Sequence, residues 1–286
     1  MTIQTRREFV KATVKTTLAA GFALAVQPVS AQTIHTDTKG LVAGEIQIPT
    51  SDGHIPGYSA RPDRPGTFPT ILVVQEIFGV HEHIRDVCRR FAKHGYLAVA
   101  PELFAREGDV STMTDINTIV TQVVSKVPDA QVMTDLDAAV QWAQKSGHGN
   151  VSKLGLTGFC WGGRIAWLYA AHNPHLKASV AWYGHLVGQP DSLHPTNPVD
   201  IAGKLHCPVL GLYGGLDQGI TADSRAQMEA DLARAHNPSQ IVVYPDAGHG
   251  FHADYRPSYN ARDAADGDQK MYAWLQGHGV AAQQST

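Results

Sequence analysis

Three residues that could do chemistry each follow an apolar, strand-like stretch of the chain. Cys160 follows LGLTGF, Asp217 follows VLGLYGG, and His249 follows IVVYP within a short loop. A cysteine thiolate can attack a carbonyl carbon, a histidine can take and return the proton, and an aspartate can orient the imidazole. The intervals between the three residues are long enough for whole strand–helix units, so we expect the three loops to meet at one edge of a sheet. The sequence therefore predicts nucleophilic catalysis by Cys160, His249 and Asp217.

The surroundings of Cys160 have the pattern of a nucleophile elbow, a sharp turn between a strand and a helix. Gly158 and Gly162 flank the cysteine as G-x-C-x-G, and the helical segment GGRIAWLYAAH follows. An elbow requires small neighbours because its central residue has a strained backbone and the helix passes close to the strand. The chain order of nucleophile, acid and histidine is also that of α/β-hydrolases. The alternative interpretation is an inert, buried cysteine in a glycine-rich turn.

Four further features of the sequence could assist the cysteine. The start of the following helix stabilises a thiolate, and the Trp161 N–H can point at a developing oxyanion. A second N–H is expected from Ile77, in the loop after the predicted strand 67–75. Glu76 follows that strand, and two interpretations of it are open. It is either a carboxylate turned to solvent or a carboxylate beside the thiol that controls the protonation of the sulfur.

The elements that must position these residues alternate between strand and helix. Continuous apolar, β-branched runs predict strands, and apolar residues at helical spacing predict helices. The predicted strands cover residues 67–75, 96–103, 153–159, 177–184, 207–215 and 240–245. The predicted helices cover residues 81–95, 111–145 with a break at Pro128, 162–172, 221–236 and a last segment that ends before Gln276. This order predicts an α/β fold with a mostly parallel central sheet and helices on both faces.

Length and charge narrow the class of protein. The chain has 286 residues, 43% of them hydrophobic, and a formal net charge of −3. This length is enough to bury one large core, and we expect a single α/β domain over residues 32–286. No run of lysine or arginine occurs beyond the N-terminus, which argues against a nucleic-acid partner. The expected partner is a small-molecule substrate.

Residues 1–31 are typical of an export signal. Arg6 and Arg7 precede the apolar stretch TTLAAGFALAV, and VSA before Gln32 resembles a cleavage site. The stretch is shorter than the roughly 20 residues that span a bilayer, so we expect no membrane span in the mature protein. The prediction is a periplasmic or secreted protein that uses the twin-arginine export machinery. The alternative is a basic amphipathic helix at a cytosolic N-terminus.

The other cysteines and a histidine pair are predicted to be structural. Cys88 lies in a helical pattern and Cys207 begins a strand, so both are expected to be small buried residues. His81 and His83 are two residues apart at a helix start, where side chains do not share a face, and no third ligand accompanies them. We therefore expect solvated histidines, no metal site and no cofactor.

These motifs resemble those of the dienelactone hydrolase (carboxymethylenebutenolidase) family. The segments QEIFG, PELFAR, GFCWGG, GGLDQ and AGHGF occur in that family's order, within residues 43–276. The resemblance implies a monomeric α/β-hydrolase fold, hydrolysis of a cyclic enol-lactone to maleylacetate, and a triad of Cys160, Asp217 and His249. It also implies that Glu76 holds the thiol protonated at rest and moves toward an arginine when substrate binds.

The chain departs from that family where arginines hold the substrate carboxylate. Residues 111–145 contain no arginine, and Ala253 stands where the family has another one. Arg256 is the nearest replacement. Arg106 and Arg85 are weaker candidates, which are better explained as solvated surface charges.

Phe78 is expected to belong to the core or to the wall of an apolar cleft, as are Trp161, Trp182 and Tyr183. The leading functional hypothesis is a hydrolase that cleaves a lactone or another small activated ester. A broader carboxylesterase or thioesterase on the same triad is the alternative enzyme. A non-catalytic binding protein on the same scaffold is the alternative from a different class.

Overall fold

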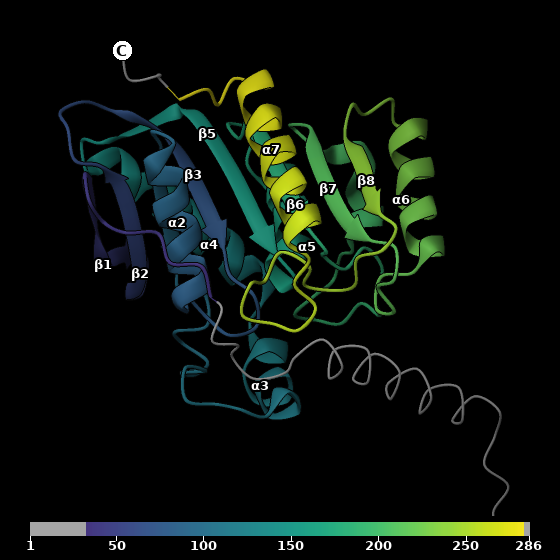
Figure 1. Ribbon diagram of the computed structural model, residues 1–286. Coiled ribbons are helices and arrows are strands. Elements are labelled where there is room, and N and C mark those ends of the chain that lie inside the picture. The colour runs from purple at the N-terminus through teal and green to yellow at the C-terminus, as the bar shows by residue number, and fades with distance from the viewer. Residues whose placement is uncertain (1–32, 283–286) are drawn as a thin grey trace, which may run out of the picture.

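The computed structural model describes residues 33–282, and its strands form one eight-stranded sheet within them (Figure 1). The strands are β1 (Leu41–Thr50), β2 (Gly53–Pro62), β3 (Phe68–Val74), β4 (Leu97–Pro101), β5 (Gly149–Phe159), β6 (Ala178–Trp182), β7 (Val209–Gly214) and β8 (Gln240–Tyr244). Their order across the sheet is β1-β2-β4-β3-β5-β6-β7-β8. β2 pairs with β1 and β4 in antiparallel fashion, whereas the pairings from β4 to β8 are parallel.

Helices cover both faces of this sheet. They are α2 (Glu82–Lys93), α3 (Ile116–Gln122), α4 (Asp129–Lys145), α5 (Trp161–His172), α6 (Ala222–Arg234) and α7 (Ala261–Gly277), with short 3-10 turns η1 (Val124–Lys126) and η2 (Pro198–Lys204). α2 and α7 lie on one face, and α4 and α5 lie on the other (Figure 1). The strands between them therefore contact apolar side chains on both sides.

The core strands have apolar sequences without alternation for this reason. Every residue of β3, β4, β6 and β7 is buried. A strand that is covered on both faces has no solvent-facing side on which polar residues would be favoured. The predicted α/β class, with a mostly parallel sheet, is confirmed.

Local signals in the chain mark where helices begin and end. Gly95, just past α2, has a φ of 88°, a left-handed conformation that glycine adopts without steric cost. The predicted break at Pro128 is confirmed, because α4 begins at the next residue. Proline lacks an N–H, and at the first turn of a helix that N–H would have no intrahelical acceptor.

Two strands precede the predicted ones and make the sheet partly antiparallel. β1 and β2 form a hairpin with Leu41 opposite Pro62 and Thr50 opposite Gly53. Ile48 is the one buried residue of β1, so this strand lacks the continuous apolar run by which covered strands are recognised. Strict alternation of strand and helix therefore begins only at β3.

The predicted export signal, residues 1–31, lies outside the described part of the chain. Within residues 33–282, no helix combines the length and the apolar character that crossing a lipid bilayer requires.

Candidate active site

Cys160 occupies a strained turn between β5 and α5. Its φ is 55° and its ψ is −112°, a combination that residues with a side chain seldom adopt. A Cβ on Gly158 would lie 2.0 Å from the Gly162 carbonyl oxygen, and a Cβ on Gly162 would lie 2.5 Å from the Gln75 carbonyl oxygen. The close approach of α5 to β5 and β3 therefore requires both glycines of the G-x-C-x-G pattern.

The three loops bring Cys160, His249 and Asp217 into contact. His249 Nε2 lies 3.2 Å from Cys160 Sγ, and His249 Nδ1 lies 2.8 Å from Asp217 Oδ2. Asp217 Oδ1 accepts hydrogen bonds from the N–H groups of Gly219 and Ile220, at 2.8 and 3.2 Å. These bonds fix the carboxylate, which in turn orients the imidazole toward the sulfur. The arrangement allows His249 to exchange a proton with the thiol.

The charges of these three residues stabilise one another in a buried environment. Cys160 is 1% exposed and His249 is 9% exposed. Burial disfavours a charged imidazole, but Cys160 and Asp217 outweigh it and raise the pKa of His249 to about 10. Burial likewise disfavours the Asp217 anion, but the hydrogen bond with His249 keeps the pKa of Asp217 below its usual value. A protonated His249 is therefore favoured when Cys160 is a thiolate.

The predicted oxyanion donors belong to the two segments that meet at the elbow. Trp161 is the first residue of α5, so its N–H has no acceptor within the helix. Ile77 is buried just beyond the end of β3. Gly162 packs against the carbonyl of Gln75, two residues before Ile77. The backbone segments that carry the two N–H groups are thus in direct contact.

Glu76 is fully buried, which excludes the solvent-facing interpretation. The Tyr255 hydroxyl donates to Glu76 Oε2. Arg256 Nη2 lies 3.4 Å from Glu76 Oε1, and His81 Nε2 lies 3.7 Å from Oε2. Burial by itself favours the neutral acid, but Arg256 and His81 hold the pKa of Glu76 well below its usual range. Glu76 is thus a carboxylate paired with an arginine, which is the arrangement that the family resemblance implies once substrate binds.

Arg256 is the substrate-binding candidate that lies beside Glu76. Its guanidinium carbon lies 4.9 Å from the centre of the Phe78 ring, and its Nε donates to the Tyr255 hydroxyl at 3.1 Å. Burial disfavours its charge, but the Glu76 carboxylate outweighs this and raises the pKa of Arg256. Phe78 and Arg256 therefore border the same charged cluster.

The two weaker arginine candidates are held in other ion pairs. Arg106 donates to Asp52 and to Asp135, both at 2.7 Å. Arg85 Nη1 lies 2.9 Å from Glu45. The Arg106 contacts connect the loop after β4 to the β1–β2 hairpin and to α4. The Arg85 contact connects α2 to β1. Their geometry favours a structural role for Arg106 over a substrate-binding one.

The prediction that His81 and His83 are both solvated was wrong. His83 is 1% exposed, and its Nδ1 lies 3.0 Å from Asp254 Oδ1. Burial lowers the pKa of His83 and outweighs the opposite effect of Asp254. His81 has an extended backbone in front of α2. The expectation that residues two apart in a helix point to different faces therefore does not hold for this pair. The His81 ring stacks on that of His83, with 6.1 Å between the ring centres. In the described chain, no cluster of three or more His, Cys, Asp or Glu side chains could hold a metal ion.

Cys88 and Cys207 are buried, as expected from their apolar surroundings. Burial raises the pKa of the Cys88 thiol far above its ordinary value and that of Cys207 to about 12. Both thiols are therefore neutral near pH 7, and Cys160 is the candidate nucleophile.

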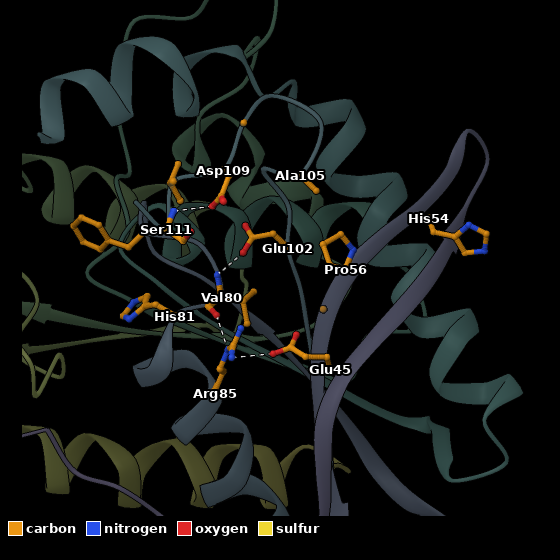
Figure 2. Close-up of a pocket in the computed structure, with 14 residues that line it drawn as sticks. Glu45, His54, Pro56, Val80, His81, Arg85, Glu102, Ala105, Asp109 and Ser111 are labelled. Atoms are coloured by element: carbon orange, nitrogen blue, oxygen red, sulfur yellow. Dashed lines mark hydrogen bonds and ion pairs between the residues drawn. The ribbon is translucent and has the colours of Figure 1, made fainter. Parts of the chain in front are cut away.

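Figure 2 shows a cleft of about 540 Å³. Its lining includes Phe78 and His81, together with Arg85 and with Glu102, which accepts from the Val80 N–H at 2.6 Å. Two of these lining residues are neighbours of the buried charges, because His81 lies beside Glu76 and Phe78 lies beside Arg256.

A second cavity, of about 250 Å³, is lined by Trp161, Arg164 and His185 among others. The residues that line these two described cavities do not include Cys160, Asp217 or His249. The first cavity reaches Phe78, which packs on Arg256, and the second reaches Trp161, the residue after Cys160.

Sequence reasoning missed Tyr255. It precedes Arg256 in the segment YRPSY, and no spacing rule marks a tyrosine there as a partner of Glu76. Tyr183, expected in the core or the wall of the cleft, is fully buried in the core. It has a left-handed φ of 38° after β6, and its ring centre lies 5.2 Å from that of His249.

Known proteins resemble this chain in sequence over most of its length. The model of the family described as "Dienelactone hydrolase family" matches residues 55–279. The chain belongs to the dienelactone hydrolase family. A protein of Methylorubrum extorquens named "Putative carboxymethylenebutenolidase" is 63% identical over 269 residues, which are 94% of this chain and 92% of that protein. A protein of Escherichia coli K12 with the same name is 53% identical over 265 residues, 92% of this chain and 97% of its own.

A crystal structure from Klebsiella pneumoniae has the same architecture. It is described as a "Putative Dienelactone Hydrolase", is 55% identical, and superposes with a TM-score of 0.81 over 82% of this chain and 98% of that one. The eight-stranded sheet with its helices is thus the α/β-hydrolase fold of this family of hydrolases.

Proposed function

We propose that the protein is a cysteine hydrolase that cleaves a lactone or another small activated ester, such as the dienelactone that yields maleylacetate. The observation that carries the proposal is the pair of contacts at 3.2 and 2.8 Å that link Cys160, His249 and Asp217 at a strained turn. A protein that only binds its ligand has no need of a nucleophile, a base and an orienting acid in contact. The proposed reaction needs no metal and no cofactor.

The proposed reaction has two steps. His249 takes the proton of the Cys160 thiol, and Cys160 Sγ attacks the carbonyl carbon. The N–H groups of Trp161 and Ile77 stabilise the oxyanion. The bond from the carbonyl carbon to the ester oxygen then breaks, and His249 gives a proton to the leaving oxygen. In the second step His249 takes a proton from water, which attacks the thioester and releases the acid and the Cys160 sulfur. Asp217 orients the imidazole throughout.

Arg256 and Phe78 are the proposed substrate-binding residues. A lactone that carries a carboxylate would pair with the Arg256 guanidinium in competition with Glu76. The Phe78 ring, 4.9 Å from that guanidinium, would contact the apolar part of the substrate.

A broader carboxylesterase or thioesterase is the second candidate. It is favoured by the lack of arginine in residues 111–145, by Ala253, and by the ion pairs that occupy Arg106. An ester without a carboxylate needs no arginine, so these departures would not weaken the binding of such a substrate.

The test is hydrolysis of a dienelactone, followed by its ultraviolet absorbance, beside p-nitrophenyl acetate. The protein and its Cys160→Ala variant are compared on both substrates. Fast loss of the lactone that depends on Cys160 supports the lactonase. Cleavage of the aryl ester alone supports the broader esterase, and no turnover of either substrate favours a binding protein.

We further propose, from residues 1–31, that the protein is exported by the twin-arginine machinery. From the family resemblance, we propose that the mature protein is a monomer. Intact mass of the periplasmic protein should match a chain that starts near Gln32, and replacing Arg6 and Arg7 by lysine should abolish export. Light scattering of the mature protein should give the mass of one chain.

A further inference from the structure

Tyr255 bridges the two oppositely charged residues beside the elbow. Its hydroxyl donates to Glu76 Oε2 and accepts from Arg256 Nε at 3.1 Å. The roles are fixed, because a guanidinium can only donate and a carboxylate can only accept. Arg256 Nη2 lies 3.4 Å from the other oxygen, Glu76 Oε1. The three side chains thus form a closed ring of contacts around one carboxylate.

This ring is shielded from solvent. Glu76 is 0%, Arg256 is 2% and Tyr255 is 7% exposed. Water does not compete for a carboxylate in such a place, so the protein groups around it decide where its oxygens point. His81 Nε2, at 3.7 Å from Oε2, is too distant to replace the Tyr255 hydroxyl as a hydrogen-bond donor.

The backbone next to Glu76 packs against the elbow that carries the nucleophile. Gly162, two residues after Cys160, packs on the carbonyl of Gln75, the residue before Glu76. Cys160 and Glu76 both act electrostatically on Arg256. A change in the direction of this carboxylate would therefore change the electrostatic potential at the sulfur.

We propose that Tyr255 is a positioning residue, whose hydroxyl holds the Glu76 carboxylate on Arg256 and so prevents it from accepting a hydrogen bond from the Cys160 thiol. The inference rests on the proposed cysteine chemistry and deepens it. A carboxylate turned toward the sulfur stabilises the neutral thiol and opposes formation of the nucleophile. Tyr255 acts through Glu76 and touches no reacting atom.

Other titratable groups also act on the two partners. The groups that face Glu76 or Cys160 from the surrounding segments are Arg256, Tyr255, His81, His83, Tyr183 and His249. A test must therefore distinguish the effect of the Tyr255 hydroxyl on the Cys160 thiol from the effects of these other groups. Replacing Tyr255 and Glu76 singly and together makes this distinction.

The experiment measures the pH dependence of the Cys160 thiolate without substrate. Ultraviolet absorbance of the thiolate is recorded for each protein, and the signal of the same protein with Cys160→Ser is subtracted. Tyr255→Phe keeps the ring and removes only the hydroxyl. We expect the midpoint of thiolate formation to rise by about one pH unit, a tenfold fall in the thiolate-to-thiol ratio. In a Glu76→Gln background the same replacement should cause no such rise, because an amide carries no charge.

Tyr96→Phe is the matched control. It also removes a buried tyrosine hydroxyl, which donates to the Val280 carbonyl at 3.0 Å, so it reproduces a general loss of stability. Its thiolate midpoint should equal that of the parent. Tyr255→Leu is a second variant without the hydroxyl, and we expect it to give the same rise as Tyr255→Phe.

Each outcome decides a different point. A parent-like midpoint in the Tyr255 variants overturns the positioning role, and so does an equal rise in the Glu76→Gln background. A Cys160→Ala variant that keeps the parent's activity on both substrates overturns the cysteine-hydrolase proposal itself. The two failures are distinguishable because the second is read from turnover by Cys160→Ala and the first from the thiolate titration of the Tyr255 variants.

Discussion

His249 Nε2 lies 3.2 Å from Cys160 Sγ, although the two residues are 89 positions apart in the chain. The contact exists because β5 and β8 end at the same edge of a parallel sheet, where their loops converge. Because the elbow holds Cys160 in a left-handed backbone conformation, its side chain meets the imidazole without further rearrangement.

Replacing the nucleophile should separate sulfur chemistry from oxygen chemistry. Cys160→Ala should abolish turnover, and Cys160→Ser should lower kcat/KM by roughly a thousandfold or more, because a hydroxyl is far harder to ionise than a thiol. Cys207→Ser, at a buried thiol outside the triad, is the control and should keep parent-like kinetics. Steady-state rates on an activated ester provide the measurement. Equal rates for Cys160→Ser and the parent would contradict a thiolate mechanism.

Asp217→Asn should move the alkaline limit of activity to lower pH. The pKa of His249 is about 10 in the folded protein, against about 6.5 in an unfolded chain. A raised pKa means that protonated His249 contributes its stabilisation fully below the unfolded value and loses it as the pH rises through about 10.

Asp217 is one of the groups that raise this pKa, so its replacement by a neutral amide lowers it. We also expect kcat/KM to fall by about 10²- to 10⁴-fold, because the imidazole loses its orienting partner. Full pH–rate profiles of parent and variant are required. An alkaline limb that stays in place would show that Asp217 does not control His249.

Gly162→Ala should disrupt the elbow. The added Cβ would lie 2.5 Å from the carbonyl oxygens of Val74 and Gln75, so α5 and β3 would have to move apart. We expect a loss of about 1–3 kcal/mol in the free energy of unfolding, with loss of activity. Gly44→Ala is the control, since a Cβ there meets nothing within 4 Å. Urea unfolding of both variants measures the difference, and equal stabilities would contradict the steric argument.

Arg106→Ala should affect stability rather than catalysis. The change leaves the buried Asp135 carboxylate without its partner and should cost about 1–3 kcal/mol. Because neither Asp52 nor Asp135 belongs to the triad, kcat/KM on an activated ester should stay close to that of the parent. Thermal unfolding and steady-state kinetics on one preparation test both halves. A large loss of activity in a fully folded variant would return Arg106 to the list of substrate-binding residues.

Arg256→Ala should discriminate between substrates. A carboxylate-bearing lactone loses its proposed ion pair, whereas p-nitrophenyl acetate has no carboxylate to lose. We expect the ratio of kcat/KM for lactone over aryl ester to fall by about 10-fold or more, the effect of one lost charged hydrogen bond. If the unpaired Glu76 lowers the activity on both substrates equally, that loss cancels in the ratio. An unchanged ratio would remove Arg256 from the substrate site.

The sequence by itself determined the fold class, the elbow and the chain order of the three residues that meet beside it. These features follow from local rules: uninterrupted apolar runs mark strands that are covered on both faces, and G-x-C-x-G meets a steric need at one turn. The hairpin of β1 and β2 was not predicted, because β1 has a single buried residue and lacks such a run.

Only the tertiary structure decided which charged groups meet. Tyr255 donates to Glu76 across 179 positions, and Arg106 reaches Asp52 across 54 and Asp135 across 29. The burial of His83 against Asp254 is another such pairing. No periodicity in the chain encodes these contacts, because they depend on which loops the sheet brings to one edge and on how much solvent is excluded there.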